Sequence, residues 1–92
     1  MMRKRIEIVE GVGHIRFSGH EGPARYAIEG EPARLRLGQG RLKGSFGVDV
    51  ETASDAFRAG VGVLTLEGGR EYRVTMVGHS TGGDEVFVEL RV

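Results

Sequence analysis

Apolar and polar residues alternate strictly from Arg41 to Glu51, and this run restricts the fold more than any other feature. One face of the run carries Leu42, Gly44, Phe46, Val48 and Val50. An α-helix repeats every 3.6 residues and would scatter these positions around its axis, so a period of two predicts a β-strand. Gly44 and Gly47 predict a bend within this strand, by which a small sheet curls on itself.

Glycine supplies 16 of the 92 residues and mostly separates short apolar runs. Glycine adopts the positive φ angles of tight turns freely, so this spacing predicts short strands joined by turns. Besides 41–51, the predicted strands cover residues 5–9, 13–17, 25–29, 33–37, 61–66, 71–77 and 85–92. We therefore expect an all-β fold, a small closed or partly open antiparallel barrel or sandwich of about 7–8 strands.

The segment from Thr52 to Gly60 interrupts the strands and predicts one short helix near residues 53–59. Thr52 or Ser54 is a suitable N-cap, and Gly60 stands where glycine commonly ends a helix. Three apolar residues would share one face of this helix: Ala53, Ala56 and Phe57. So short a helix is stable only when packed, and we expect it to plug one end of a barrel.

Ninety-two residues suffice for one hydrophobic core, so residues 1–92 are expected to form a single domain. The absence of cysteine excludes disulfides and thiolate metal sites. No apolar run approaches the ~18 residues that span a bilayer. Glu7 and Glu10 interrupt the apolar region that a signal peptide needs after its basic start. We expect a cytoplasmic protein that does not contact membranes.

Residues 78–82 read G-x-S-x-G, the nucleophile-elbow pattern of serine hydrolases. In those enzymes the serine stands on a sharp turn between a strand and a helix. Here the alternating run 86–90 follows the motif, and the chain is too short for a hydrolase sheet with its helices. The motif therefore predicts a glycine-rich hairpin loop, and we assign no catalytic residue.

Three histidines, His14, His20 and His79, are the candidate metal ligands, because zinc binds imidazole nitrogen and carboxylate oxygen. Nearby carboxylates could complete the site: Glu21, Asp84 and Glu85. The spacing of the histidines matches no H-x-H or H-x-x-x-H pattern, and His20 and His79 fall in predicted turns. No cofactor is expected, and a small metal-dependent enzyme stays the third hypothesis.

A predicted basic hairpin at residues 34–43 exposes four cations: Arg34, Arg36, Arg41 and Lys43. The 13 basic and 13 acidic residues of the chain balance, which argues against a bulk polyanion binder. Small barrels bind single-stranded nucleic acid with a basic face plus outward aromatic rings, whereas Phe46 alternates inward here. A solvated basic edge that discourages strand aggregation is the simpler interpretation. Nucleic-acid binding is the second hypothesis.

Phe87 points outward if Val86, Val88 and Leu90 face the core, and it is buried if the strand is covered on both faces. An outward aromatic residue is a typical protein contact. A core this small also gains from a partner. The leading hypothesis is a non-catalytic binding or assembly module that contacts a protein through Phe87, with self-association as one form of that contact.

Overall fold

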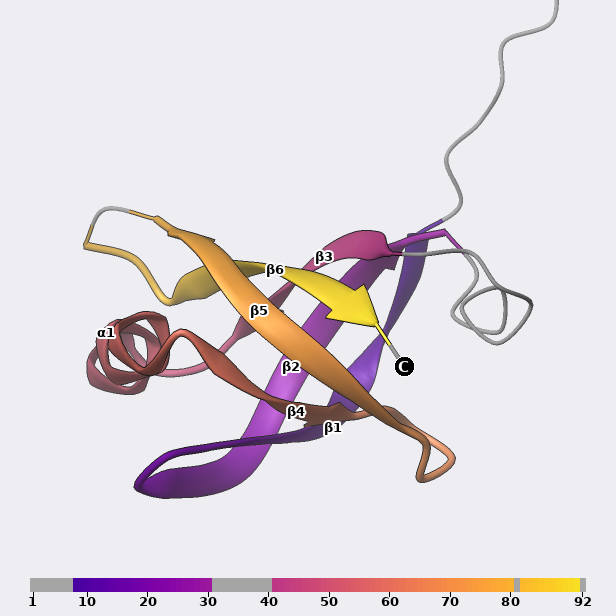
Figure 1. Ribbon diagram of the computed structural model, residues 1–92, viewed down its shortest axis with the longest axis horizontal. Helices are drawn as coiled ribbons and strands as arrows, with labels where there is room; N and C mark the ends of the chain where they lie inside the picture. The colour runs from indigo at the N-terminus through magenta and orange to yellow at the C-terminus, as the bar shows by residue number, and fades with distance from the viewer. Residues whose placement is uncertain (1–7, 31–40, 81, 92) are drawn as a thin grey trace, which may run out of the picture.

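The protein is a closed antiparallel β-barrel with one helix (Figure 1). The structure is a computed structural model and describes residues 8–30, 41–80 and 82–91. In these ranges the elements are β1 (Ile8–Phe17), β2 (His20–Glu29), β3 (Leu42–Gly47), α1 (Val50–Ala59), β4 (Val61–Thr65), β5 (Glu71–His79) and β6 (Glu85–Arg91). The all-β class and the short helix are confirmed, and of the predicted alternatives the structure has the closed barrel. The described strands number six rather than seven or eight, and the predicted strand 33–37 lies outside the described residues.

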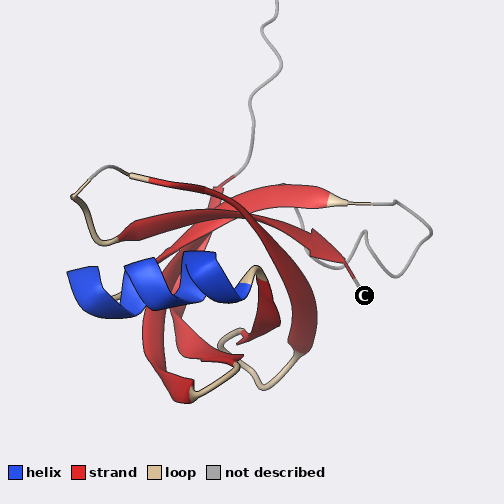
Figure 2. Cartoon of the chain, turned by 60° about the vertical axis from the view of Figure 1, so that its left-hand side comes forward, coloured by secondary structure: helices blue, strands red, loops and turns tan. Residues whose placement is uncertain are grey.

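The strands follow the order β1-β2-β3-β6-β5-β4 around the barrel, and β4 pairs back onto β1. Neighbouring strands are antiparallel throughout. α1 lies against one end of the barrel, on the way from β3 to β4 (Figure 2). It packs on β4, β5 and β6 through Ala53 and Ala56, which are fully buried. The helix therefore closes this end as predicted, but Phe57, the third residue of the predicted apolar face, is exposed.

β1 runs unbroken from Ile8 to Phe17 and pairs with β2 along its whole length. The predicted division of this segment into two strands, 5–9 and 13–17, is therefore wrong. Gly13 marks a close approach instead, because a Cβ there would collide with the carbonyl oxygen of Thr65 on β4. Glycine inside a strand often permits such backbone contact, so the same residue type that makes turns elsewhere serves here to close the barrel.

β3 ends at Gly47 and α1 begins at Val50, so the predicted strand 41–51 is too long and the predicted helix too short. The N-cap is Asp49, neither Thr52 nor Ser54. The carboxylate of Asp49 accepts hydrogen bonds from the N–H and the hydroxyl of Thr52, both at 2.8 Å. It thereby satisfies one of the helix N–H groups that lack an intrahelical partner. The predicted C-terminal Gly60 is confirmed in the left-handed conformation, with φ of 84°.

Asp49→Ala is expected to destabilise the protein at neutral pH and to make little difference in acid. The N–H of Thr52, followed by its hydroxyl, holds the pKa of the Asp49 carboxyl below its usual value. A carboxyl whose pKa is lower in the folded than in the unfolded chain contributes stability above its unfolded pKa. That contribution is lost as the pH falls through the folded pKa. Urea unfolding midpoints at about pH 7 and about pH 3 measure the difference.

Asp55→Ala is the matched control, because Asp55 lies exposed on the same helix and bonds to no described residue. The control should lack the pH-dependent loss of stability. An Asp49→Ala midpoint equal to that of the wild type at neutral pH would show that the cap contributes nothing.

The barrel interior is filled by alternating residues of the strands. The largest of the fully buried side chains are Phe46, Ile15, Ile28, Leu64 and Leu90. Along β6 the residues at 86, 88 and 90 face this core, so those at 85, 87, 89 and 91 face outward. In the described ranges no helix has the length and apolar character needed to cross a membrane.

Candidate functional site

Phe87 stands on the outer face of β6 and is 42 % exposed, whereas its neighbours Val86 and Val88 are buried. Of the two placements that the sequence left open for Phe87, the structure has the outward one, and burial on both faces is excluded. The ring lies over Gly78 of β5, where a Cβ would come within 3.4 Å of the ring atom Cδ2. Bare glycine backbone lets the aromatic ring rest on the sheet with part of its surface open to solvent.

A β-bulge in β5 sets Val77 beside Phe87. The β5–β6 register shifts between Met76 and Gly78, so Val77 and Gly78 together stand opposite Phe87 alone. A bulge of this kind re-aims the residues that follow it. Val77 is 55 % exposed, and His79, beyond the bulge, is set opposite the buried Val86.

Val61 of β4 adds a third apolar side chain to this surface and is 61 % exposed. It pairs with Thr75 on the neighbouring strand β5. We call the group Val61, Thr75, Val77 and Phe87 the outer apolar patch. It extends over three adjacent strands, of which β5 crosses nearest the viewer in Figure 1. Apolar side chains grouped on the surface of a small protein commonly mark a contact site.

Opposite charges flank the outer apolar patch. On one side, Arg73 of β5 lies directly opposite Arg91 of β6, and neither comes within 4.0 Å of a carboxylate of the described residues. On the other side, Glu85 of β6 accepts a hydrogen bond from Ser45 at 3.1 Å and has no described cation partner. Like charges directly opposite one another destabilise a sheet, so the barrel itself gains nothing from the arginine pair.

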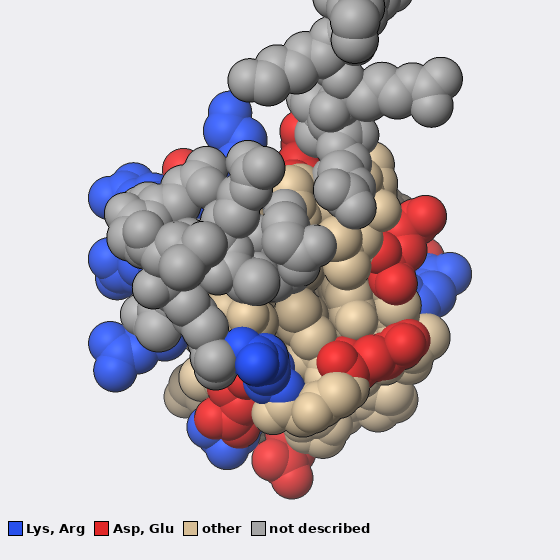
Figure 3. Space-filling model, turned by 90° about the vertical axis from the view of Figure 1, so that its right-hand side faces the viewer, with Lys and Arg blue, Asp and Glu red and all other residues tan. Residues whose placement is uncertain are grey.

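Cations are unevenly placed on the molecule. Figure 3 shows Lys and Arg side chains along its left edge, which is the side nearest the viewer in Figure 1, where β5 and β6 lie. Acidic side chains are more frequent on the right of an uncharged strip in the same view. The barrel therefore presents a locally basic surface although its formal net charge is zero.

Of the predicted basic hairpin, Arg34 and Arg36 lie outside the described residues. The Nη1 of Arg41 is 3.2 Å from the Oε1 of Glu89 on β6. Lys43 pairs with the same Glu89 on β6 and with Glu29 on β2. The acidic partners come from other strands, so the sequence of the predicted basic hairpin could not show them.

The three histidines are on different parts of the barrel. His14 on β1 places its Nε2 3.9 Å from the Oε2 of Glu21. His20 stacks on Phe17 with ring centres 5.1 Å apart, and His79 lies 5.9 Å from the ring of Phe57 on α1. His20 begins β2 and His79 ends β5, so the prediction that these two histidines lie in turns is wrong. Within the described ranges, no three metal-binding side chains come together.

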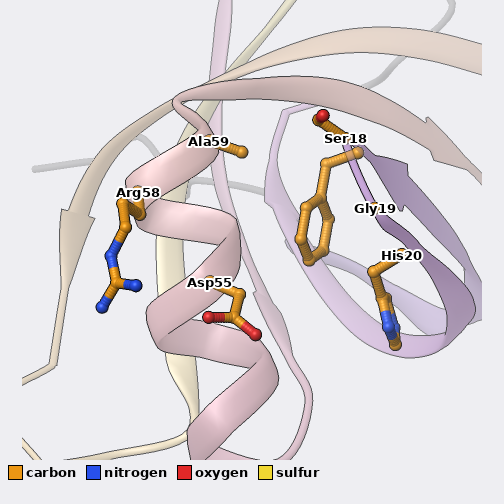
Figure 4. Close-up of a pocket in the computed structure, with 7 residues that line it drawn as sticks. Ser18, Gly19, His20, Asp55, Arg58 and Ala59 are labelled. Atoms are coloured by element: carbon orange, nitrogen blue, oxygen red, sulfur yellow. The ribbon is translucent and has the colours of Figure 1, made fainter.

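A groove of about 390 Å³ separates the β1–β2 hairpin from α1 (Figure 4). Its polar lining includes Ser18, His20, Asp55 and Arg58. Serine, histidine and aspartate are the residue types of a hydrolytic triad, yet no hydrogen bond joins these three, and the His20 ring is stacked on Phe17. An activated nucleophile needs a base within hydrogen-bond reach, so the groove as it stands lacks that arrangement.

Gly78 and His79 of the G-x-S-x-G motif end β5, and Ser80 and Gly82 lie between β5 and β6, so the antiparallel strand of a hairpin follows the motif, as predicted. The Oγ of Ser80 donates to the carbonyl oxygen of Glu85 at 3.2 Å and accepts from its N–H at 3.4 Å. The hydroxyl thus serves as both donor and acceptor within the hairpin. Ser80 therefore stabilises the turn that starts β6 and so helps to place Phe87.

No protein-family model matches the chain, and neither a curated protein nor a solved structure shows significant similarity to it. The outer apolar patch is the surface of the described residues best suited to bind a partner. Sequence reasoning found Phe87 and missed Val61, Val77 and the pair Arg73–Arg91. Alternation along 71–77 signals that residues 73, 75 and 77 share a face, but only the barrel order joins them to β4 and β6.

Proposed function

We propose that this protein is a non-catalytic binding or assembly module that holds another protein chain against the outer apolar patch. One observation carries the proposal: Val61, Val77 and Phe87 are exposed together on adjacent strands of a barrel whose interior is already filled. Aromatic and aliphatic side chains at the centre of an interface supply most of its affinity when they lose contact with water.

The position of Phe87 favours tight binding for a second reason. Its ring already rests on Gly78, and a side chain that is partly held in place loses less conformational entropy when a partner covers it. The polar and charged residues beside it would form the rim that surrounds such a contact.

The partner would pack side chains on this face rather than add a strand to it. β5 is hydrogen-bonded to β4 and β6, and β6 is also paired with β3. Partners that extend a sheet need a strand edge with free N–H and C=O groups. Residues 73–75 of β5 and the matching part of β6 present no such edge.

Phe87→Ala is expected to weaken association with the partner about 30-fold or more, the effect of removing an interface residue worth about 2 kcal/mol. The same change should lower the thermal unfolding temperature by only a few degrees, because the ring is on the surface and only its contact with Gly78 is lost. Titration of the purified partner, followed by isothermal calorimetry, gives the dissociation constants of the two proteins.

Photo-crosslinking identifies the partner for this titration. A photoreactive phenylalanine analogue introduced at position 87 is expected to give a covalent adduct in cells that produce the protein. The matched control is the same analogue at Val12, which is exposed on β1 outside the patch. The adduct is identified by mass spectrometry and its formation repeated with purified components. Equal labelling at both positions, or none at 87, would remove the support for this surface.

A nucleic-acid ligand is the second candidate, and one observation favours it. Phe87, Arg73 and Arg91 face outward on adjacent strands, so an exposed ring and two cations without a partner among the described residues share one surface. Such a surface binds single strands by stacking and by contacts to phosphates. Glu85 and Glu89 on the same strand would repel a polyanion, which is why we place this candidate second. Failure of a labelled oligonucleotide to bind at low salt would eliminate it.

A further inference from the structure

The outer face of β6 is complementary to itself in charge, and from this we infer that the chain seated on the outer apolar patch is a second copy of this protein. The inference rests on the proposed function and names its partner. The two copies would be related by a two-fold axis, so that each supplies the same surface to the other.

The outward residues along β6 begin with an acid and end with a base. Glu85 is at one end and Arg91 at the other, with Phe87 between them. Glu89 also faces outward but is already paired with Arg41 at 3.2 Å. At the basic end, Arg73 on β5 doubles the positive charge. The charges left without a described ion-pair partner are thus a carboxylate at one end and two guanidinium groups at the other.

A two-fold axis that lies in the contact plane, perpendicular to β6 and level with Val88, would bring the acidic end of one copy to the basic end of the other. Residues 85 and 91 are both three positions from Val88, or about 10 Å at the rise of a β-strand. Rotation about that axis reverses the strand, so Arg91 of one copy faces Glu85 of its mate. The same contact forms a second time by symmetry, because a two-fold interface pairs each residue reciprocally.

This arrangement accounts for the opposed arginines. In the single barrel, Arg73 and Arg91 repel one another across β5 and β6. A carboxylate from a second copy would relieve this repulsion. The two Phe87 rings would lie on either side of the axis, each beside the Glu89 of the mate that is paired with Arg41, and would lose contact with water. The ion pairs would chiefly set the orientation of the copies, and the apolar centre would supply the affinity.

The test is a charge exchange followed by sedimentation equilibrium of the full chain, from about micromolar to about millimolar concentration. The wild type is expected to reach twice its monomer mass of 10.0 kDa as the concentration rises. An acidic variant carries Arg73→Glu and Arg91→Glu, and a basic variant carries Glu85→Arg. Like charges then face each other in each homodimer, so each variant alone should associate at least tenfold more weakly.

Mixing the two variants in equal amounts is the decisive step. A two-fold interface predicts recovery as a one-to-one heterodimer, because every acidic end then meets a basic one. Arg70→Glu, an exposed change in the β4–β5 turn, is the matched control and should dimerise as the wild type does. Circular dichroism establishes that each variant is folded before its molar mass is measured by sedimentation equilibrium.

Each other outcome overturns the inference in a distinguishable way. A wild type that stays monomeric, together with a crosslink from position 87 to a different protein, leaves the proposed function standing and removes the second copy as partner. A monomer with no crosslink at all removes both. A dimer that neither variant weakens, or that the mixture fails to restore, contradicts the two-fold arrangement through Glu85 and Arg91.

Discussion

Gly13→Ala is expected to destabilise the protein by about 3 kcal/mol or more, which for a domain of this size means partial or complete unfolding. The added methyl group would collide with the carbonyl oxygen of Thr65 and lie 3.1 Å from the carbonyl carbon. Both are backbone atoms of β4. They cannot withdraw without breaking the pairing of His14 with Thr65, which belongs to the short ladder that closes the barrel.

Urea unfolding followed by circular dichroism measures this loss, and Gly47→Ala provides the matched control. A Cβ at Gly47 would lie 3.1 Å from the nearest atom of the Arg25 guanidinium, which is the end of a flexible side chain. The control should therefore lose about 1 kcal/mol or less. Equal stability of Gly13→Ala and the wild type would mean that β1 and β4 do not approach as closely as the barrel requires.

Phe46→Ala is expected to cost about 3–5 kcal/mol, because Phe46 is 1 % exposed and its ring is the largest fully buried side chain of the core. The residue lies on β3 between Tyr26 of β2 and Val86 of β6, so a cavity there would separate two sides of the barrel. Urea unfolding followed by circular dichroism gives the change in the free energy of unfolding. A Phe46→Ala protein with no folded spectrum in the absence of urea would have lost all of its stability.

Phe87→Ala is the matched comparison, since it removes the same ring from the outer face of the neighbouring strand. It is expected to cost about 1 kcal/mol or less, from the lost contact with Gly78. The two variants together separate a phenylalanine that builds the barrel from one that is available to a partner. Similar losses of stability for both would place Phe87 in the core and remove the basis of the outer apolar patch.

Among the features that the sequence predicted, the most secure were those that a few neighbouring residues control. Alternation at 42–47 and 85–91 predicts strands, and it also assigns Phe46 inward and places Phe87 on the face opposite to Val86 and Val88. The glycine at position 60 predicts the end of α1. The G-x-S-x-G run predicts a hairpin loop because a strand follows it. Each of these depends on a period or a backbone preference that acts over a few residues.

The wrong secondary-structure predictions came from sequence patterns that fit two different local structures. Gly11 and Gly13 suggest a turn, but the chain continues as one strand because these glycines admit Tyr26 and Thr65. Alternation through Val48 and Val50 suggests a longer strand, but the Asp49 carboxylate starts a helix there. Glycine serves turns and close contacts alike, and a cap overrides the weak preference of two valines.

What the sequence determined by itself is the β class, the short helix and the two faces of β6, because side-chain direction in a strand alternates whatever its neighbours are. Only the tertiary structure decided which strands are neighbours. The order β3-β6-β5-β4 brings Arg41 to Glu89 across 48 residues and sets Arg73 against Arg91. It also joins Phe87 to Val77 and Val61. Closure and register depend on the whole barrel at once, so no single stretch of the chain could specify this surface.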